Sequence, residues 1–346
     1  MGIESYGLSV GSLPRGPRNS IADVADVKVG HTTVDDPAQE LHTGVTVIVP
    51  CEGPVFSARP VAAAHSLNGY GKTCGTVQVA ELGYLETPIA LTGTMNVGRV
   101  ADALIENALR EEERAGHALP QSVNPVVGET NDGRISRIQA RPVGTKEVLA
   151  AIDSASKDFA RGAVGAGRGT ICFGLKGGIG TSSRLVEKGG RAWTVGVLVQ
   201  TNFGRMPDLM VCGRHMGPQV LERIAGDNDA CAPEKGSVMV VVATDAPLSS
   251  RQLGRVIRRA TVGLVRCGSY MGHGSGDIFL GFTTGLSMGT EDNVLPACER
   301  VPEESLNAFF RACAEATEEA VLDSLVEAEA ATGLDGTVYH SLTEFL

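Results

Sequence analysis

The sequence lacks the features that mark several common classes of protein. Its eight cysteines form no Cys-x-x-Cys pair, which disfavours zinc ribbons and thioredoxin-like motifs. Acidic residues outnumber basic ones by 40 to 30. The resulting net charge of −10 repels phosphate backbones, so we expect no nucleic-acid partner. The longest apolar strings, such as Val238–Ala243, fall far short of the ~20 residues that a membrane helix needs, so we expect no membrane association.

Signals for export, nucleotides and metals are missing as well. The N-terminus has no basic stretch followed by an apolar one, which predicts a cytoplasmic protein with reduced thiols. Glycine-rich strings such as GYGKT at 69–73 lack the spacing of a phosphate-binding loop. The histidines His31, His65 and His273 form no spaced metal pair. We therefore expect neither a cofactor nor a metal.

The chain is instead rich in apolar residues, and predicted strands alternate along it with predicted helices. Of its 346 residues, 42% are hydrophobic, and no shift in composition marks a domain boundary. β-Branched runs predict strands at Val45–Val49, Trp193–Gln200, Val238–Ala243 and Ile278–Thr284. Apolar periodicity and capping residues predict helices at Val100–Arg114, from Ser249 or Ser250 to Gly268, and at Glu303–Ala331. This alternation favours an α/β or a layered α+β fold.

The most informative local feature is a loop that runs directly into a strand. The segment Gly226–Gly236 is rich in Gly, Asp and Pro, and Ser237 begins the valine-rich run that follows. If the Gly236–Ser237 bond were cut, Ser237 would carry an α-amine with a pKa near ~8, which can act as general base for its own hydroxyl. Glycine at 236 crowds an attack on its carbonyl least. The plainer interpretation is a common turn before a strand.

Longer motifs around this junction and elsewhere in the chain resemble those of a known family. KGSVMVVVATDAPLS, which contains Ser237, resembles the start of the small subunit in the DmpA-type aminopeptidases, the L-aminopeptidase/D-esterase family. Further segments resemble the family in the same order, from about residue 19 to 284: NSIADVADVKVGHTT, HTGVTVIVP, LNGYGKTCG, ELGYLETPIALTGTMNVG, VVGETNDG, GAVGAG with LKGGIGTSSR, VLVQTNFG and GHGSGDIFLGFTT. Each is weak alone, and together they are highly specific.

The resemblance implies a fold, a processing event and an activity. The fold is an α+β, four-layer αββα sandwich shared with ornithine acetyltransferases, formed by residues 1–346 as one domain. The precursor cleaves itself into a large chain, 1–236, and a small chain, 237–346, which stay associated. The product is an N-terminal-nucleophile serine hydrolase that releases N-terminal residues from small peptides, amides or esters. Relatives assemble as tetramers of the paired chains, so a homo-oligomer is expected.

The resemblance also assigns site residues. Ser237 matches the nucleophile, and Gly236 lies on the other side of the cut. Asn202 matches a side-chain amide that helps to bind the oxyanion, for which its NH₂ is a neutral donor. Ser275 matches a serine that hydrogen-bonds near the nucleophile and its amine. Asp277 matches a position where relatives carry an acidic residue, Asp or Glu, and a carboxylate there can steady the ammonium of Ser237 or relay its proton.

The spacing of Ser275 and Asp277 allows two interpretations. Two residues apart, they share one face if the stretch begins a strand. Taken without the resemblance, Ser275-Gly276-Asp277 is more simply a turn in which the carboxylate caps backbone amides.

The expected substrate pocket departs from the family. Glu129 and Asn131 match positions that line this pocket, but several relatives have the longer Tyr at the position of Asn131. The family often has Glu where this chain has Lys72. If that position contacts the substrate's amino group, the local charge is reversed; the simpler interpretation makes Lys72 a solvated loop residue.

Two alternative functions stay open at this point. One is an acyltransferase of the ornithine acetyltransferase type, although that family normally has Thr at the cut site. The other is a homologue that does not cleave itself and only binds small molecules or serves as a scaffold. The combined presence of Ser237, Asn202 and Ser275 argues against the second.

Overall fold

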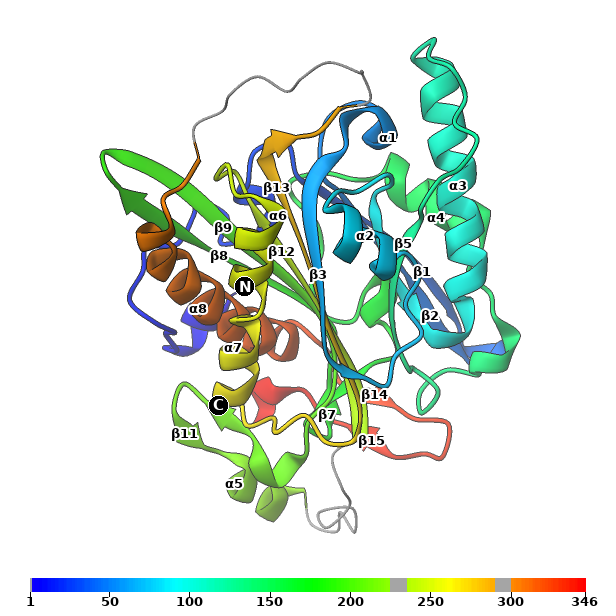
Figure 1. Cartoon of the computed structure of the whole chain (residues 1–346). Helices are drawn as coiled ribbons and strands as arrows, with labels where there is room; N and C mark the ends of the chain where they lie inside the picture. The colour runs from blue at the N-terminus through cyan, green and yellow to red at the C-terminus, as the bar shows by residue number, and fades with distance from the viewer. Residues whose placement is uncertain (1, 225–234, 290–299) are drawn as a thin grey trace.

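The computed structural model describes residues 2–224, 235–289 and 300–346. Its centre is a five-stranded sheet in the order β3-β13-β12-β9-β8, in which β12 runs parallel to β13 and antiparallel to β9 (Figure 1). The strands are β3 (Pro60–Gly69), β8 (Ile179–Lys188), β9 (Arg191–Asn202), β12 (Lys235–Thr244) and β13 (Gly274–Ser287). The valine-rich run predicted from the sequence is therefore the middle strand of this sheet.

A second sheet of four strands lies face to face with the first. Its order is β1-β2-β4-β5, and only β4 and β5 run parallel. The strands are β1 (Lys28–Asp36), β2 (Leu41–Val49), β4 (Ile89–Gly93) and β5 (Val126–Thr130). Residues of both sheets form one apolar cluster between them, which includes Ile48 and Leu91 of one sheet and Val241 and Leu280 of the other.

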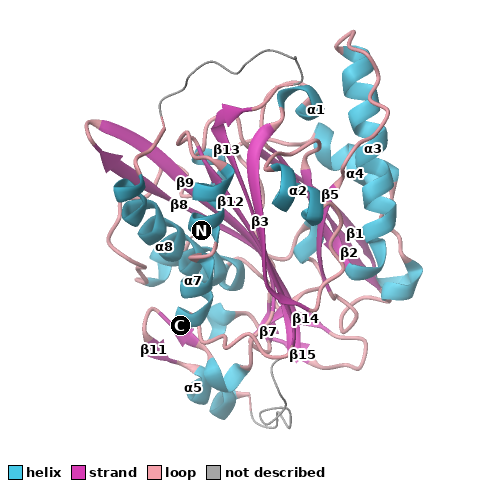
Figure 2. Cartoon of the chain, viewed as in Figure 1, coloured by secondary structure: helices cyan, strands magenta, loops and turns pink. Residues whose placement is uncertain are grey.

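Helices cover the outer face of each sheet. Figure 2 shows the two layers of strands between two layers of helices. The five-stranded sheet is covered by α6 (Ser250–Ile257), α7 (Ala260–Arg266) and α8 (Leu306–Val326), and the four-stranded sheet by α3 (Val97–Arg114) and α4 (Thr145–Asp153). This arrangement confirms the predicted four-layer αββα sandwich. In the part of the chain that the structure describes, no helix has both the length and the apolar character needed to cross a bilayer.

Shorter elements complete the chain. The helices α1 (Val55–Ala58) and α2 (Thr76–Leu82) lie near β3. The helix α5 (Gly217–Arg223) comes after β9 in the chain and before β12. Three two-stranded ribbons pair β6 (Ile171–Cys172) with β7 (Leu175–Lys176), β10 (Met210–Val211) with β11 (Arg214–His215), and β14 (Ala331–Thr332) with β15 (Val338–Tyr339).

The bounds of two predicted helices and the first residue of the predicted central strand were wrong. The helix expected between Ser250 and Gly268 is two helices, because the chain turns at Arg258 and Arg259; its predicted cap is confirmed, since Ser249 accepts a hydrogen bond from the backbone of Gln252. The helix expected at Glu303–Ala331 ends at Val326. The loop expected at Gly226–Gly236 lies outside the described residues up to 234, and Gly236 already belongs to β12.

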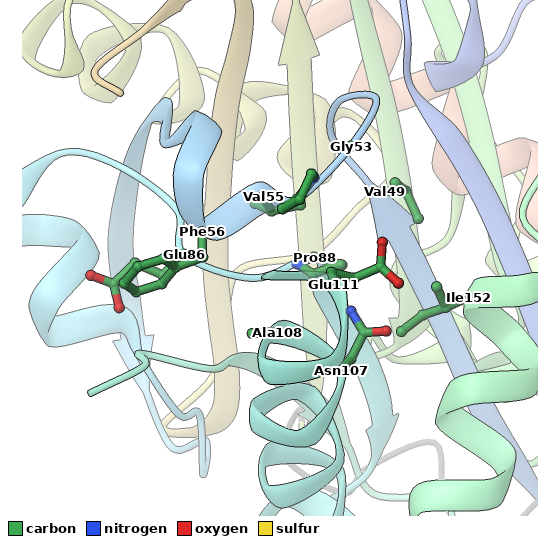
Figure 3. Close-up of a pocket in the computed structure, with 11 residues that line it drawn as sticks. Val49, Gly53, Val55, Phe56, Glu86, Pro88, Asn107, Ala108, Glu111 and Ile152 are labelled. Carbon is green, nitrogen blue, oxygen red and sulfur yellow. The ribbon is translucent and has the colours of Figure 1, made fainter. Parts of the chain in front are cut away.

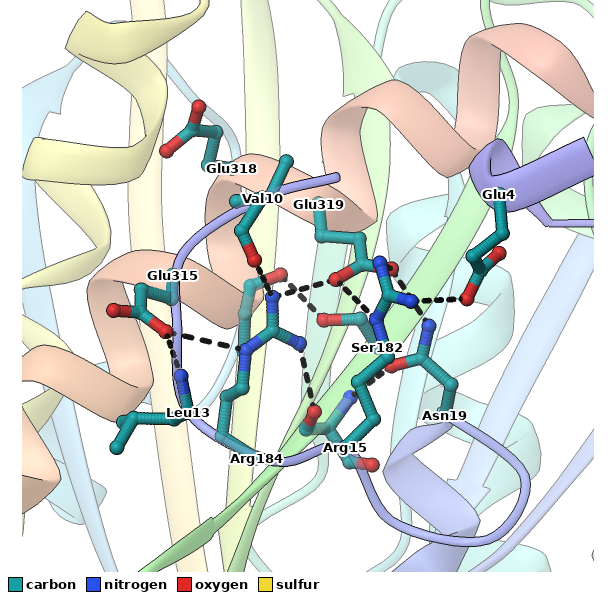
Figure 4. Close-up of polar contacts among 12 residues, drawn as sticks. Glu4, Val10, Leu13, Arg15, Asn19, Ser182, Arg184, Glu315, Glu318 and Glu319 are labelled. Atoms are coloured by element: carbon teal, nitrogen blue, oxygen red, sulfur yellow. Dashed lines mark hydrogen bonds and ion pairs between the residues drawn. The ribbon is translucent and has the colours of Figure 1, made fainter. Parts of the chain in front are cut away.

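A buried ionic network ties α8 to the N-terminal part of the chain (Figure 4). Arg184 of β8 is fully buried; its Nη2 lies 2.5 Å from Glu319 Oε2 and its Nε lies 3.4 Å from Glu315 Oε2. The same Nη2 donates to the carbonyl of Val10. Arg15 adds a contact of 2.8 Å to Glu319. The acidic residues of this helix therefore face inward and are neutralised by arginines of distant segments.

Replacement of Arg184 tests this network. The Arg184→Met chain should lose about 3 kcal/mol of unfolding free energy, because two buried carboxylates lose a common cation. Chemical denaturation measures the loss. The matched control is Arg114→Ala, which removes an exposed ion pair with Glu111 and should cost ~0.5 kcal/mol or less. Equal losses in the two variants would contradict the structural role of the network.

Candidate active site

Strand register brings four of the predicted residues to one end of the central sheet. Ser237 pairs with Asn202 of β9 in the antiparallel ladder. On its other side, β12 pairs in parallel with β13, so that Gly236 lies beside Ser275 and Ser237 beside Gly276. Residues that are 35 to 40 positions apart in the sequence thus become direct neighbours of the Gly236–Ser237 peptide.

The Gly236–Ser237 peptide has a geometry that only glycine permits. Gly236 has φ +145°, a conformation that side chains disfavour. A Cβ built there would lie 2.1 Å from the carbonyl oxygen of Asn202. The buried Ser237 hydroxyl donates to the Gly236 carbonyl oxygen at 2.7 Å. The hydroxyl is therefore held beside the carbonyl of the peptide bond that precedes it.

Asn202 shares a face of the sheet with Ser237. Side chains of β12 alternate: Met239 and Val241 pack between the sheets, and Val238 and Val240 pack under the helices. Ser237 therefore points between the sheets, and its ladder partner Asn202 points the same way. The Asn202 Oδ1 accepts a hydrogen bond of 3.0 Å from the backbone N–H of Ile171, which fixes the Nδ2 group as the donor of this amide.

Ser275 and Asp277 lie on the opposite face of the sheet. Both are buried within β13, so the alternative of a turn does not hold. The Ser275 hydroxyl donates to Asp277 Oδ1 at 2.9 Å, which confirms that the two share one face. Along β13, Ile278 and Leu280 pack between the sheets, so alternation places this pair on the side of the helices. It approaches the Gly236–Ser237 peptide from the face opposite to the Ser237 hydroxyl.

The segment Gly69–Lys72 connects the ends of the two sheets. A Cβ on Gly276 would lie 2.7 Å from the carbonyl oxygen of Tyr70, so the segment crosses β13 closely. The buried Glu129, at the end of β5, accepts a hydrogen bond of 2.9 Å from the backbone N–H of Lys72. The Lys72 side chain is exposed, and its ammonium lies 4.8 Å above the Tyr70 ring. Its charge is therefore stacked on an aromatic ring, as expected for a solvated loop residue.

Asn131 is placed differently from Glu129. It is exposed, and its Oδ1 accepts the backbone N–H of Gly133 at 2.9 Å. The side chain thus closes a local turn after β5. Of the two residues predicted for the substrate pocket, only Glu129 is buried and in contact with the segment beside β13.

One contact at the site, the hydrogen bond from Ile171 to Asn202, was not predicted. Sequence reasoning missed Ile171, because it acts through its backbone N–H and no side-chain pattern reveals such a role.

A cavity of about 50 Å³ lies between α1 and α3, and Figure 3 shows its lining, which includes Phe56, Asn107 and Ile152 but none of the predicted site residues. A volume that holds one or two waters is too small for a peptide.

No metal site emerges from the described residues. Within residues 2–224, 235–289 and 300–346, no three His, Cys, Asp or Glu side chains are grouped as metal ligands. That no metal or cofactor takes part stays a prediction.

Comparisons with known proteins define the class first. The αββα layers match, at a TM-score of 0.90 and 32% identity, the L-aminopeptidase D-Ala-esterase/amidase of Ochrobactrum anthropi, which is described as a prototype of the serine aminopeptidases and a new variant of the Ntn hydrolase fold; the match covers 99% of this chain and 95% of that one. The class is that of the Ntn-type hydrolases. More particularly, the chain belongs to peptidase family S58, whose model matches residues 19–339.

Two further similar proteins are named a β-peptidyl aminopeptidase and a β-aminopeptidase. The β-peptidyl aminopeptidase BapA of Sphingosinicella microcystinivorans is 38% identical over 341 residues, which cover 93% of this chain and 84% of the relative. The β-aminopeptidase of a Burkholderia species matches at a TM-score of 0.89 and 37% identity over 99% of this chain and 96% of that one. The chain is accordingly a hydrolase of the aminopeptidase type, and the acyltransferase alternative is not favoured.

The requirement for glycine at position 236 is testable. In a Ser237→Ala background, Gly236→Ala should lower the unfolding free energy by ~2 kcal/mol or more, because the new Cβ collides with the backbone of β9 at a positive φ. Chemical denaturation measures the change. Gly98→Ala is the control: this helical glycine has open space around it, and alanine there should stabilise by ~0.5–1 kcal/mol. A Gly236→Ala chain as stable as its parent would refute the close approach.

Proposed function

We propose that the chain cleaves itself between Gly236 and Ser237 and then acts as an N-terminal-nucleophile serine aminopeptidase. One observation carries the proposal: the Ser237 hydroxyl lies 2.7 Å from the Gly236 carbonyl oxygen, at the start of the central strand and opposite Asn202. The hydroxyl oxygen attacks the Gly236 carbonyl carbon and its proton passes to the Ser237 nitrogen. The C–N bond then breaks, which leaves an ester and a free α-amine. Water then hydrolyses the ester, which releases the Gly236 carboxylate.

In the processed enzyme, the α-amine of Ser237 is the general base. It takes the proton of its own hydroxyl as the oxygen attacks the substrate carbonyl, and it returns a proton to the leaving amine. The Asn202 Nδ2 group donates a hydrogen bond to the oxyanion. Ser275 and Asp277 approach from the other face of the sheet, so we assign them to the α-amine of Ser237 rather than to its hydroxyl. They stabilise the α-ammonium while it holds the proton. Water hydrolyses the acyl-enzyme ester.

The two processed chains, 1–236 and 237–346, remain one domain in this proposal. The small chain supplies β12 and β13 from the middle of the sheet, together with α8. The large chain supplies Arg184 and Arg15, which pair with the carboxylates of α8, and Arg161, whose Nη1 lies 2.6 Å from Asp323. Burial raises the pKa of Asp323 to about 7, although the charge of Arg161 acts to lower it.

We propose small peptides, amides or esters with a free N-terminus as substrates. The names of the relatives make N-terminal β-amino acids strong candidates. Glu129 is the group that binds the substrate's ammonium, since it is buried, acidic and held beside β13 by the Lys72 backbone. We also place Asn131 at the outer end of this pocket, where its exposed side chain is shorter than Tyr and leaves more room. A cytoplasmic location and a tetramer of processed pairs stay predictions.

Self-cleavage is tested on a denaturing gel. The wild-type chain should give two bands, of 236 and 110 residues (346 − 236 = 110), and Ser237→Ala should give one band of full length without peptidase activity. Ser287→Ala, at the exposed far end of β13, is the control and should be processed normally. A wild-type chain that hydrolyses amino-acyl amides while it remains intact would rule out this mechanism and favour a different nucleophile.

The role of Glu129 is tested by a change that keeps its shape. Glu129→Gln retains the oxygen that accepts the Lys72 N–H and removes the charge, so processing should continue. The loss of one charged hydrogen bond, ~1.5–3 kcal/mol, should lower kcat/KM for substrates with a free amino group by about 10- to 100-fold. Glu113→Gln on the exposed end of α3 is the control. If kcat/KM changes less than twofold, the ammonium is bound elsewhere.

A further inference from the structure

A buried lysine stands behind the proposed oxyanion donor. Lys176 of β7 is completely buried, and its ammonium donates to three backbone carbonyl oxygens: Gly167 at 3.0 Å, Thr170 at 2.9 Å and Gly177 at 2.6 Å. No neutral side chain offers three donors from one atom, so the site is built for an ammonium. Burial lowers the pKa of Lys176 to about 7, which means that the fold bears a cost to keep a lysine here.

One of the three carbonyls belongs to the peptide group that orients Asn202. The carbonyl oxygen of Thr170 and the N–H of Ile171 are the two ends of a single planar peptide unit. The oxygen accepts from Lys176 Nζ and, at 3.0 Å, from the backbone N–H of Gly177. The N–H at the other end donates to Asn202 Oδ1 at 3.0 Å. An unbroken chain of hydrogen bonds therefore runs from the Lys176 ammonium through one peptide group to the Asn202 amide.

We propose that Lys176 is a positioning residue for the oxyanion donor, acting on Asn202 through the Thr170–Ile171 peptide. This inference rests on the proposed role of Asn202. The bonds to Gly167 and Gly177 hold the ammonium in place, and its bond to the Thr170 carbonyl fixes the Thr170–Ile171 peptide. The peptide in turn fixes the Asn202 amide with its Nδ2 group toward the face of Ser237. The positive charge at one end of the chain also polarises each amide in turn, which makes the Nδ2 hydrogens stronger donors.

The effect expected on catalysis is large, because a catalytic group that is misplaced by ~1 Å can cost about 100-fold in rate. The loss of the oxyanion donor itself, as in Asn202→Ala, should lower kcat by about 10²- to 10³-fold. Removal of Lys176 can cost no more than this if it acts only through Asn202. We therefore expect Lys176→Gln, which keeps two donor hydrogens, and Lys176→Met, which keeps none, to lower kcat in increasing order within that limit.

A double-mutant cycle tests whether Lys176 affects kcat through Asn202. Single and double variants of Lys176 and Asn202 are assayed with an amino-acyl p-nitroanilide, and kcat is expressed per processed chain from the band ratio on a gel. Lys176→Met should lower kcat at least ~10-fold in the wild-type background and less than ~2-fold in the Asn202→Ala background. KM should change little in both, since Asn202 acts in the transition state.

The controls separate positioning from stability. Ser182→Ala removes another buried hydrogen bond, to the Ala316 carbonyl, and should leave kcat unchanged. An equal fold-loss from Lys176→Met in both backgrounds would assign Lys176 to the fold alone and overturn the proposal, and so would an unchanged kcat. If Lys176→Met does not fold, the cycle is run with Lys176→Gln; failure of both to fold also overturns it. Failure of the proposed function is distinguished by an Asn202→Ala chain that keeps full kcat.

Discussion

The placement of β12 between β9 and β13 is the constraint on which the rest of the structure depends. Its register sets Ser237 opposite Asn202 and Gly236 beside Ser275. A shift of one residue would turn the Ser237 side chain to the other face of the sheet and would put a side chain against the backbone of β9, where only Gly236 fits. The apolar alternation of β12 prevents that shift, since Met239 must lie between the sheets and Val238 under the helices. Core packing and site geometry are thus determined by the same ten residues.

The layers and the main strands could be predicted from the sequence because they depend on local patterns. The run Val238–Ala243 is a strand by composition, and the motifs around Ser237, Asn202 and Ser275 indicate which elements meet. The orientation of the site could not be predicted in the same way. Whether Asp277 faces the Ser237 hydroxyl depends on which side of β13 the helices cover, and that is a property of the packed sheets. The contact of Ile171 with Asn202 is made by a backbone group, so no residue type marks it.

The sequence also could not predict which charged side chains are buried. The C-terminal helix is rich in acidic residues, and such a helix is usually solvated. In the structure, Glu315, Glu319 and Asp323 of α8 are buried and face arginines from three distant segments. Lys176 shows the same principle in reverse: a lysine in a glycine-rich turn is ordinarily exposed, yet here three carbonyl groups surround its ammonium. In both cases, partners remote in the sequence decide whether a charge is buried.

The location of β12 at the centre of the sheet has a consequence for the life of the molecule. A chain that folds while continuous needs no encounter between its two halves. If the proposed cleavage separates Gly236 from Ser237, noncovalent contacts alone hold the same architecture. Unfolding then releases two polypeptides, and recovery requires their collision, so it depends on concentration. A chain cleaved in this way would be assembled once, and its lifetime would be governed by its rate of unfolding.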